Sequence, residues 1–180
     1  MIGVLVSGEG TNLQALIDAE LPIACVASNK AGVRALERAA AAGIPARVYA
    51  LEDFVDREQR DAELADWLTL RGVDLVVLAG YMQLLTEPFI DRFRDRIVNV
   101  HPSLLPDFPG AHPLDEALAA GVETTGVTVH YVDEGVDSGP VIRQESVPLE
   151  PRDTLVERIH AVEHRLLPEV VRELESGARR

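Results

Sequence analysis

The first hundred residues alternate short, continuously apolar runs with amphipathic segments, and this alternation constrains the fold more than any other feature. The apolar runs are residues 2–6, 23–28, 47–50, 75–79 and 97–100, and the segments between them with helical patterns are 12–19, 33–42, 56–71 and 87–93. Runs that are apolar at nearly every position, and do not alternate with polar residues, are typical of parallel strands covered on both faces. The alternation of strands and helices therefore predicts a doubly wound, parallel α/β sheet.

The pattern changes after about residue 100. Four prolines at 102, 106, 109 and 113 predict a shaped loop. A short helix at 114–120 follows, then two strands at 125–132 and 141–147 around a loop with Gly135 and Gly139, and a last helix from 153 to about 175. We find no linker, so we predict a single domain over residues 1–180 with halves 1–100 and 101–180.

Composition excludes several classes of protein. A length of 180 residues suits one domain, and a hydrophobic content of 47% argues against disorder. The net charge of −13 disfavours nucleic acid as a partner, and no stretch approaches the roughly 20 apolar residues of a membrane span. We see no signal peptide. The single cysteine, Cys25, lies in an apolar run and is predicted to be a small buried hydrophobe. A cytoplasmic protein is expected.

A glycine-rich loop at residues 7–12 follows the first strand and opens the first helix. The N–H groups of a helix N-terminus form an anion site that glycines leave accessible. The third glycine of a dinucleotide fingerprint is replaced by Leu13, and no Lys-Ser/Thr pair marks a P-loop. One phosphate group, held by Gly10, Thr11 and Asn12, is therefore the expected ligand. The alternative is a tight turn capped by Thr11 or Asn12.

Asn99 and His101 stand at the end of the fifth apolar run, before Pro102. Strand side chains alternate between faces, so these two residues point the same way, and Pro102 stops the strand. Asp137, in a glycine-flanked loop, is the acid best placed to join them. An amide can donate to a developing oxyanion, and a carboxylate favours a protonated imidazole. The set predicts direct attack of a substrate nucleophile on a carbonyl, although Asn-x-His pairs are more often structural.

Other polar residues carry weaker signals. Ser103 has no adjacent base, so a serine triad is not expected. His130 lies in a strand and is predicted to be structural or to support the site, whereas His112 lines a pocket or is exposed. The histidines lack metal-ligand spacing, so no metal is predicted. Glu163 interrupts the apolar stripe of the last helix, where a carboxylate needs a partner: a ligand amine or an internal arginine.

Six motifs together resemble one family. They are Ser-Gly-Glu-Gly-Thr-Asn at 7–12, Ala-Ser-Asn-Lys at 27–30, Leu-Ala-Gly-Tyr-Met at 78–82, Asn-Val-His-Pro-Ser-Leu-Leu-Pro at 99–106, Pro-Gly-Ala-His at 109–112 and Asp-Ser-Gly-Pro-Val-Ile at 137–142. Over essentially the whole chain the sequence resembles the phosphoribosylglycinamide formyltransferases, folate-dependent enzymes of purine synthesis. The resemblance implies a Rossmann-like three-layer α/β fold with a mostly parallel sheet and a C-terminal antiparallel extension.

The resemblance also implies roles for particular residues. The enzyme would transfer a formyl group from 10-formyltetrahydrofolate, its co-substrate, to the amine of 5'-phosphoribosylglycinamide. Asn99 and His101 would stabilise the tetrahedral intermediate, Asp137 would orient His101, and Glu163 would contact the glycinamide. Gly10, Thr11 and Asn12 would bind the phosphate. The folate would contact Arg57, Met82, Gln83, Leu84, Leu85 and Asp133. Gln83 departs from the arginine found in relatives, which puts a second cation for the folate tail in doubt.

Competing interpretations remain open at this point. A formyltetrahydrofolate deformylase would use water in place of the amine, but the known enzymes carry an extra N-terminal domain. An initiator-tRNA formyltransferase normally carries an RNA-binding domain and lacks the glycine loop. A non-catalytic module that binds a phosphorylated ligand would leave Asn99, His101 and Asp137 without a role. The sequence is compatible with a monomer or a homodimer.

Overall fold

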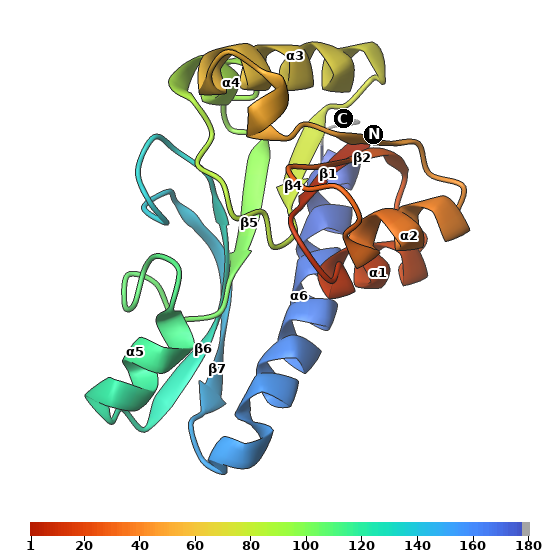
Figure 1. Cartoon of the computed structure of the whole chain (residues 1–180). Helices are drawn as coiled ribbons and strands as arrows, with labels where there is room; N and C mark the ends of the chain where they lie inside the picture. The colour runs from red at the N-terminus through yellow and green to blue at the C-terminus, as the bar shows by residue number, and fades with distance from the viewer. Residues whose placement is uncertain (178–180) are drawn as a thin grey trace. The chain divides into compact units, whose positions relative to one another are not determined.

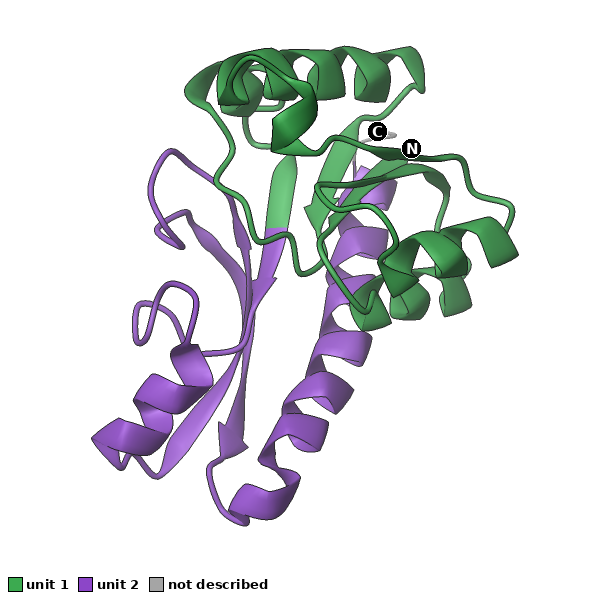
Figure 2. Cartoon of the chain, viewed as in Figure 1, with its two compact units in different colours: residues 1–98 green, residues 99–180 purple. Residues whose placement is uncertain are grey.

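The computed structural model describes residues 1–177 (Figure 1). The chain divides into two compact units, residues 1–98 and 99–180, coloured separately in Figure 2. The predicted halves, 1–100 and 101–180, divide the sequence at nearly the same place. That these two halves form one domain, and that each half has its own binding role, stays a prediction.

Unit 1 consists of parallel strands and paired helices. Strand β1 pairs in parallel with β2 and with β4, and β2 pairs in parallel with β3. Figure 1 shows these strands between the helix pair α1 and α2 and the helix pair α3 and α4. The elements are β1 (Ile2–Val6), α1 (Thr11–Asp18), β2 (Ile23–Ser28), α2 (Arg34–Ala41), β3 (Ala46–Val48), the 3₁₀ turn η1 (Leu51–Asp53), α3 (Arg57–Leu70), β4 (Leu75–Leu78) and α4 (Glu87–Arg92).

The strand order is β3-β2-β1-β4-β5-β6-β7, where β5 spans Ile97–His101, β6 spans Thr124–Tyr131 and β7 spans Val141–Pro148. Strands β2 and β3 are added on one side of β1, and the chain then returns to add β4 on the other side, parallel to β1. The direction of strand addition therefore reverses between β1 and β4. In open α/β sheets, ligands bind at the carboxyl ends of the strands at such a reversal. The loops that leave β1 and β4, residues 7–10 and 79–86, are therefore the places in unit 1 where a ligand is expected.

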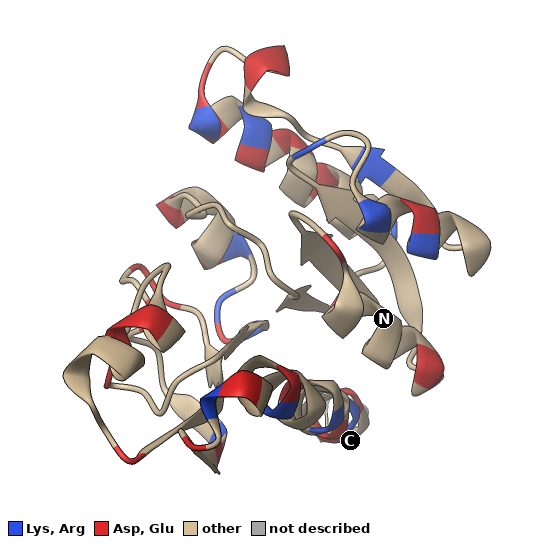
Figure 3. Ribbon diagram, turned by 60° about the horizontal axis from the view of Figure 1, so that its bottom comes forward, with Lys and Arg blue, Asp and Glu red and all other residues tan. Residues whose placement is uncertain are grey.

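Unit 2 is built on an antiparallel pair. Strands β6 and β7 pair antiparallel, with a register shift between Val129 and His130. Figure 1 shows them between α5 (Pro113–Ala120) and α6 (Leu155–Gly177), which follows the 3₁₀ turn η2 (Arg152–Thr154). Helix α6 packs on β6 and β7 through its apolar stripe. Charges of both signs mark α6 in Figure 3, and its Arg165 pairs with Glu145 of β7 at 2.5 Å.

The predicted elements agree closely with the structure in their positions, and most differences lie at their ends. The prediction of burial on both faces is wrong for β3, whose three residues are exposed because this strand lies at the edge of the sheet. Strand β5 includes His101 and stops there, because Pro102 has no N–H to donate. Strand β3 ends at Val48, two residues before its predicted end, because the chain then turns into η1. No helix within residues 1–177 is long and apolar enough to cross a membrane.

The core of unit 1 includes the predicted buried thiol, which leads to a testable pH effect. Cys25 on β2 is 0% exposed. Burial raises the pKa of Cys25 from 9.0 to about 11, against an opposing effect of the Arg71 charge. As the pH rises above 9.0, the unfolded chain loses this proton and the folded chain keeps it, so the free energy of unfolding falls until about pH 11. The expected loss is about 2–3 kcal/mol, measured by urea denaturation across this range.

A variant separates Cys25 from other groups that titrate in the same range. Tyr81 is also buried, and burial raises its pKa from 10.0 to about 12, so its effect begins one unit higher. Cys25→Ala should show a much smaller loss of stability between pH 9 and 10 than the wild type. An equal loss in both proteins would mean that the thiol does not cause it.

Candidate active site

Three side chains predicted to act together do meet at the end of β5. Asn99 and His101 alternate with Val100 along the strand, so both project to the same side, where Asp137 approaches from the loop after β6. The amide Nδ2 of Asn99 donates to Oδ1 of Asp137 at 3.4 Å. Nδ1 of His101 lies 3.4 Å from Oδ2 of the same carboxylate. One carboxylate therefore contacts both residues, one through each oxygen.

Both ring nitrogens of His101 face oxygen acceptors. Nε2 lies 2.9 Å from the carbonyl oxygen of Phe108, and Nδ1 faces Asp137. A neutral imidazole has one N–H and satisfies only one of these acceptors, whereas the protonated ring donates to both. The His101 side chain is 6% exposed, so water competes little for these contacts. The geometry suits a ring that carries and transfers a proton.

Asp137 is held in its ionised form by its surroundings. Burial by itself would raise the pKa of Asp137, but the contact with His130, the Gly110 N–H at 2.8 Å and the nearby His101 outweigh it, so the pKa lies below its ordinary value. The backbone of Asp137 has a φ of 51°, in the left-handed region that Asp tolerates better than most residues. This conformation presents the carboxylate to Asn99 and His101.

His130 is the one member of the cluster whose place the sequence analysis left open. The residue is 1% exposed on β6. Its Nδ1 lies 2.8 Å from the Tyr131 carbonyl oxygen and so donates a proton, while Nε2 lies 3.2 Å from Nδ2 of Asn99 and 3.5 Å from Oδ1 of Asp137. Nε2 therefore faces the Asn99 amide and the Asp137 carboxylate at once, so His130 positions both groups. The position of His130 in an alternating strand was the only sequence signal, and it does not reveal which residues face it.

The loops around the cluster are fixed by their own hydrogen bonds. Thr128, which is 0% exposed, donates to the carbonyl of Ser103 at 2.7 Å and accepts from the N–H of Leu105 at 3.1 Å, which anchors the proline-rich loop to β6. Oδ1 of Asp133 accepts from the Gly135 N–H and the Ser138 hydroxyl at 3.0 and 2.7 Å. The carboxylate of this predicted folate-binding residue therefore shapes the 133–138 loop itself.

The glycine loop of unit 1 has the geometry of a helix N-terminus open to a ligand. Gly10 is the residue before α1 and has a φ of 70°, and a Cβ there would lie 2.6 Å from Cβ of Ala35. Glycine is therefore required at this position by packing as well as by conformation. The first turn, which contains Thr11 and Asn12, carries no acidic residue. Its positive end can thus face an anion.

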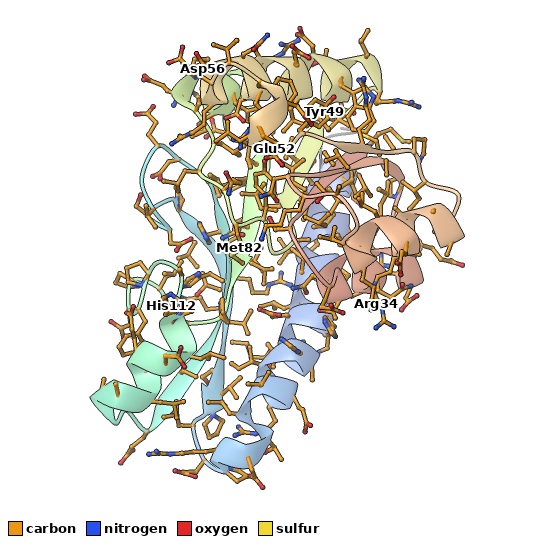
Figure 4. The ribbon with its side chains drawn as sticks, in the orientation of Figure 1. Arg34, Tyr49, Glu52, Asp56, Met82 and His112 are labelled. Carbon is orange, nitrogen blue, oxygen red and sulfur yellow. The ribbon has the colours of Figure 1, made fainter. Side chains whose placement is uncertain are left out.

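The segment 82–85 lies beside this loop. The hydroxyl of Ser7 accepts from the N–H of Met82 at 2.8 Å and donates to Oδ1 of Asn29 at 2.6 Å. Met82, labelled in Figure 4, and Leu84 are 67% and 58% exposed, whereas Leu85 is buried. These contacts place the predicted phosphate loop and part of the predicted folate segment next to each other within unit 1.

The remaining predicted residues lie on helices. Arg57 is exposed at the start of α3, whose N-cap Asp56 accepts from the N–H of Gln59 at 2.8 Å. Glu163 is 6% exposed on α6, between the buried Ile159 and Leu166 of the same helix face. In the part of the chain that the structure describes, no group of three or more His, Cys, Asp or Glu residues is placed to hold a metal ion.

Known proteins share this sequence and this architecture. The family described as "Formyl transferase" matches residues 1–171. The phosphoribosylglycinamide formyltransferase of Haemophilus influenzae is 43% identical over 98% of this chain and 87% of its own length. The chain belongs to the phosphoribosylglycinamide formyltransferase family. A crystal structure of the Bacillus halodurans member is 40% identical, with a TM-score of 0.94 over 98% of this chain and 96% of that one.

Membership of the phosphoribosylglycinamide formyltransferase family confirms several predictions. The α/β fold with a mostly parallel seven-stranded sheet and antiparallel C-terminal strands is confirmed, as is the class of enzyme, a folate-dependent formyltransferase of purine biosynthesis. A trifunctional purine biosynthetic protein of Drosophila pseudoobscura pseudoobscura is 50% identical over 99% of this chain. The chain spans only 14% of the length of that protein and of its insect counterparts.

Proposed function

We propose that this chain transfers the formyl group of 10-formyltetrahydrofolate to the amine of 5'-phosphoribosylglycinamide, without a covalent enzyme intermediate. The observation that carries the proposal is the contact of the Asp137 carboxylate with both Asn99 and His101. This cluster offers hydrogen-bond donors and a proton carrier but no serine or cysteine nucleophile. Such a set suits direct attack of a substrate amine on the formyl carbon.

In the proposed reaction, the amine nitrogen forms a bond to the formyl carbon, and the formyl oxygen gains negative charge. The amide of Asn99 would donate to that oxygen. So would the Nε2–H of His101, which in this structure donates to the carbonyl oxygen of Phe108. The bond between the formyl carbon and N10 of the folate then breaks. One proton leaves the amine and one reaches N10, with His101 and Asp137 assisting the transfer through an ordered water.

The remaining predicted residues would bind the two substrates. Gly10, Thr11 and Asn12 would hold the phosphate at the N-terminus of α1, and Glu163 would contact the glycinamide near its amine. Exposed apolar side chains at Met82 and Leu84 suit the pterin ring of the folate. The assigned folate contacts are Arg57, Met82, Gln83, Leu84, Leu85 and Asp133. No metal is part of the proposal.

A direct assay distinguishes this reaction from the deformylase alternative. Purified protein is mixed with 10-formyltetrahydrofolate, with and without phosphoribosylglycinamide, and both tetrahydrofolate and the formylated product are quantified. We expect one equivalent of each product, formed only when the amine substrate is present. Release of tetrahydrofolate and formate without the amine would instead identify a deformylase, and folate unchanged in both mixtures would leave a binding module.

The phosphate assignment gives a separate prediction. Thr11→Val and Asn12→Ala should raise the KM for phosphoribosylglycinamide about tenfold or more, because a hydrogen bond to a charged group contributes roughly 1.5–3 kcal/mol. The KM for the folate should change little. Thr69→Val on α3, which removes only a hydroxyl that donates to the Ala65 carbonyl, is the matched control. An unchanged KM for the phosphorylated substrate in both loop variants would rule out the assignment.

A further inference from the structure

Unit 1 contains a fully buried arginine that the proposed reaction does not use. Arg60 on α3 is 0% exposed, although arginine is rarely buried without a partner. Its Nε and one terminal nitrogen contact Oδ1 of the neighbouring Asp61 at 2.9 and 2.7 Å. Since Asp61 is also 0% exposed, the two charges neutralise each other inside the protein. A buried pair of this kind costs desolvation energy, which its hydrogen bonds to the surrounding protein must offset.

Both members of the pair reach the loop that follows β4. The second terminal nitrogen of Arg60 donates to Oε1 of Gln83 at 3.1 Å. The amide Nε2 of Gln83 in turn donates to the carbonyl of Met82 at 2.9 Å. Oδ2 of Asp61 accepts from the N–H of Thr86 at 2.8 Å. The ion pair therefore holds this loop at two points, one at Gln83 and one at Thr86.

The same loop is held at further points and presents two apolar side chains. Tyr81 and Leu85 are 8% and 9% exposed, and the N–H of Met82 donates to Ser7. Between these anchors, Met82 and Leu84 are 67% and 58% exposed. Ordering a loop costs conformational entropy, and a loop that is already ordered does not incur that cost again when a ligand binds.

We propose that Arg60 is a positioning residue for the folate: through Gln83 it fixes the backbone of segment 82–85 in the shape that receives the pterin end. The inference rests on the proposed function and deepens it. Gln83 acts here as the link between Arg60 and the segment, because its amide oxygen and nitrogen are both engaged within the protein. The guanidinium, neutralised by Asp61, acts on the segment and not on the folate carboxylates.

The obvious test, removal of the arginine side chain, would leave Asp61 buried and unpaired and would risk unfolding. Arg60→Lys avoids this, because one ammonium group keeps the ion pair with Asp61 but cannot also reach Gln83. Gln83→Leu breaks the same contact from the other side and leaves the ion pair intact. The double variant completes a double-mutant cycle. Gln59→Leu is the matched control, since Gln59 is exposed on α3 and its side chain hydrogen-bonds to the N–H of Val55 and to Glu63.

The readouts are the Kd of a non-hydrolysable folate analogue, measured by calorimetry, and the KM values for the two substrates. We expect Arg60→Lys and Gln83→Leu each to raise the Kd and the folate KM about tenfold. The Kd of the double variant should be no higher than that of the single variant that binds the analogue less tightly. The kcat and the KM for phosphoribosylglycinamide should change less than twofold, and Gln59→Leu should match the wild type. A merely structural role would alter the melting temperature without this selective effect on the folate.

Three outcomes would overturn the inference. The first is an unchanged folate Kd in both single variants, and the second is additive effects in the double variant, which would mean that Arg60 does not act through Gln83. The third is an equal rise in both KM values. Each is interpretable only if the wild type binds the analogue. A wild type that binds no folate at all would contradict the proposed function itself.

Discussion

Replacing His101 or Asp137 by alanine is expected to lower kcat by roughly two orders of magnitude or more. His101→Ala removes both the donor proposed for the formyl oxygen and the group that carries a proton. Asp137→Ala removes the carboxylate that contacts Asn99 and His101 and that accepts from the Gly110 N–H at 2.8 Å. Because these interactions strengthen as charge develops in the transition state, kcat should fall more than either KM rises.

The measurement is steady-state kinetics at saturating folate and amine substrate, with the melting temperature recorded for each variant. His160→Ala is the control, since this exposed histidine of α6 stacks on His164 and has no role in the proposed chemistry. The pKa of Asp137 lies below its ordinary value of 3.8, so this carboxylate should stay ionised throughout the neutral range. Near-normal kcat in both variants would overturn the assigned roles.

Asp61→Ala is expected to give the largest loss of stability, about 3–5 kcal/mol. The substitution leaves the guanidinium of Arg60 buried with a positive charge and no carboxylate, and it removes the acceptor for the N–H of Thr86. A domain of this size has a free energy of unfolding of about 5–15 kcal/mol, so the variant should be close to the limit of folding at 37 °C. Urea denaturation at 25 °C measures the loss.

Asp66→Ala provides the matched control on the same helix. Asp66 pairs with Arg92 at 2.5 Å, but the two side chains are 65% and 41% exposed. Exposed ion pairs contribute about 0–1 kcal/mol, so this variant should remain within about 1 kcal/mol of the wild type. If Asp66→Ala and Asp61→Ala had similar effects, the burial of the Arg60–Asp61 pair would not be what stabilises unit 1.

Much of the fold could be predicted because its signals are local. The apolar runs at 2–6 and 23–28 coincide with β1 and β2, since strands that are buried on both faces need apolar side chains at nearly every position. The end of β5 at His101 followed from the missing N–H of Pro102. The six motifs led to the phosphoribosylglycinamide formyltransferase family, which the comparisons confirm, while the roles of individual site residues stay predictions.

Other features could not be predicted, because they depend on contacts between distant parts of the chain. Nothing near His130 in the sequence indicates that its ring meets Asn99, which is 31 residues away. In the sequence, Arg60 resembles the other charged residues of an amphipathic helix, which are expected to be exposed, yet it is fully buried. Its burial depends on Asp61 and on Gln83, which is 23 residues away across α3 and β4.

The sequence alone therefore determined the order of strands and helices, the placement of Asn99 and His101 on one side of a strand end, and the burial of Cys25. Backbone geometry and hydrophobic periodicity act over a few residues, so the sequence expresses them directly. Tertiary structure decided which groups neutralise or orient one another: His130 beside Asn99, and Asp61 and Gln83 around Arg60. The physical reason is that polar groups are buried only where the fold brings their partners within hydrogen-bonding distance.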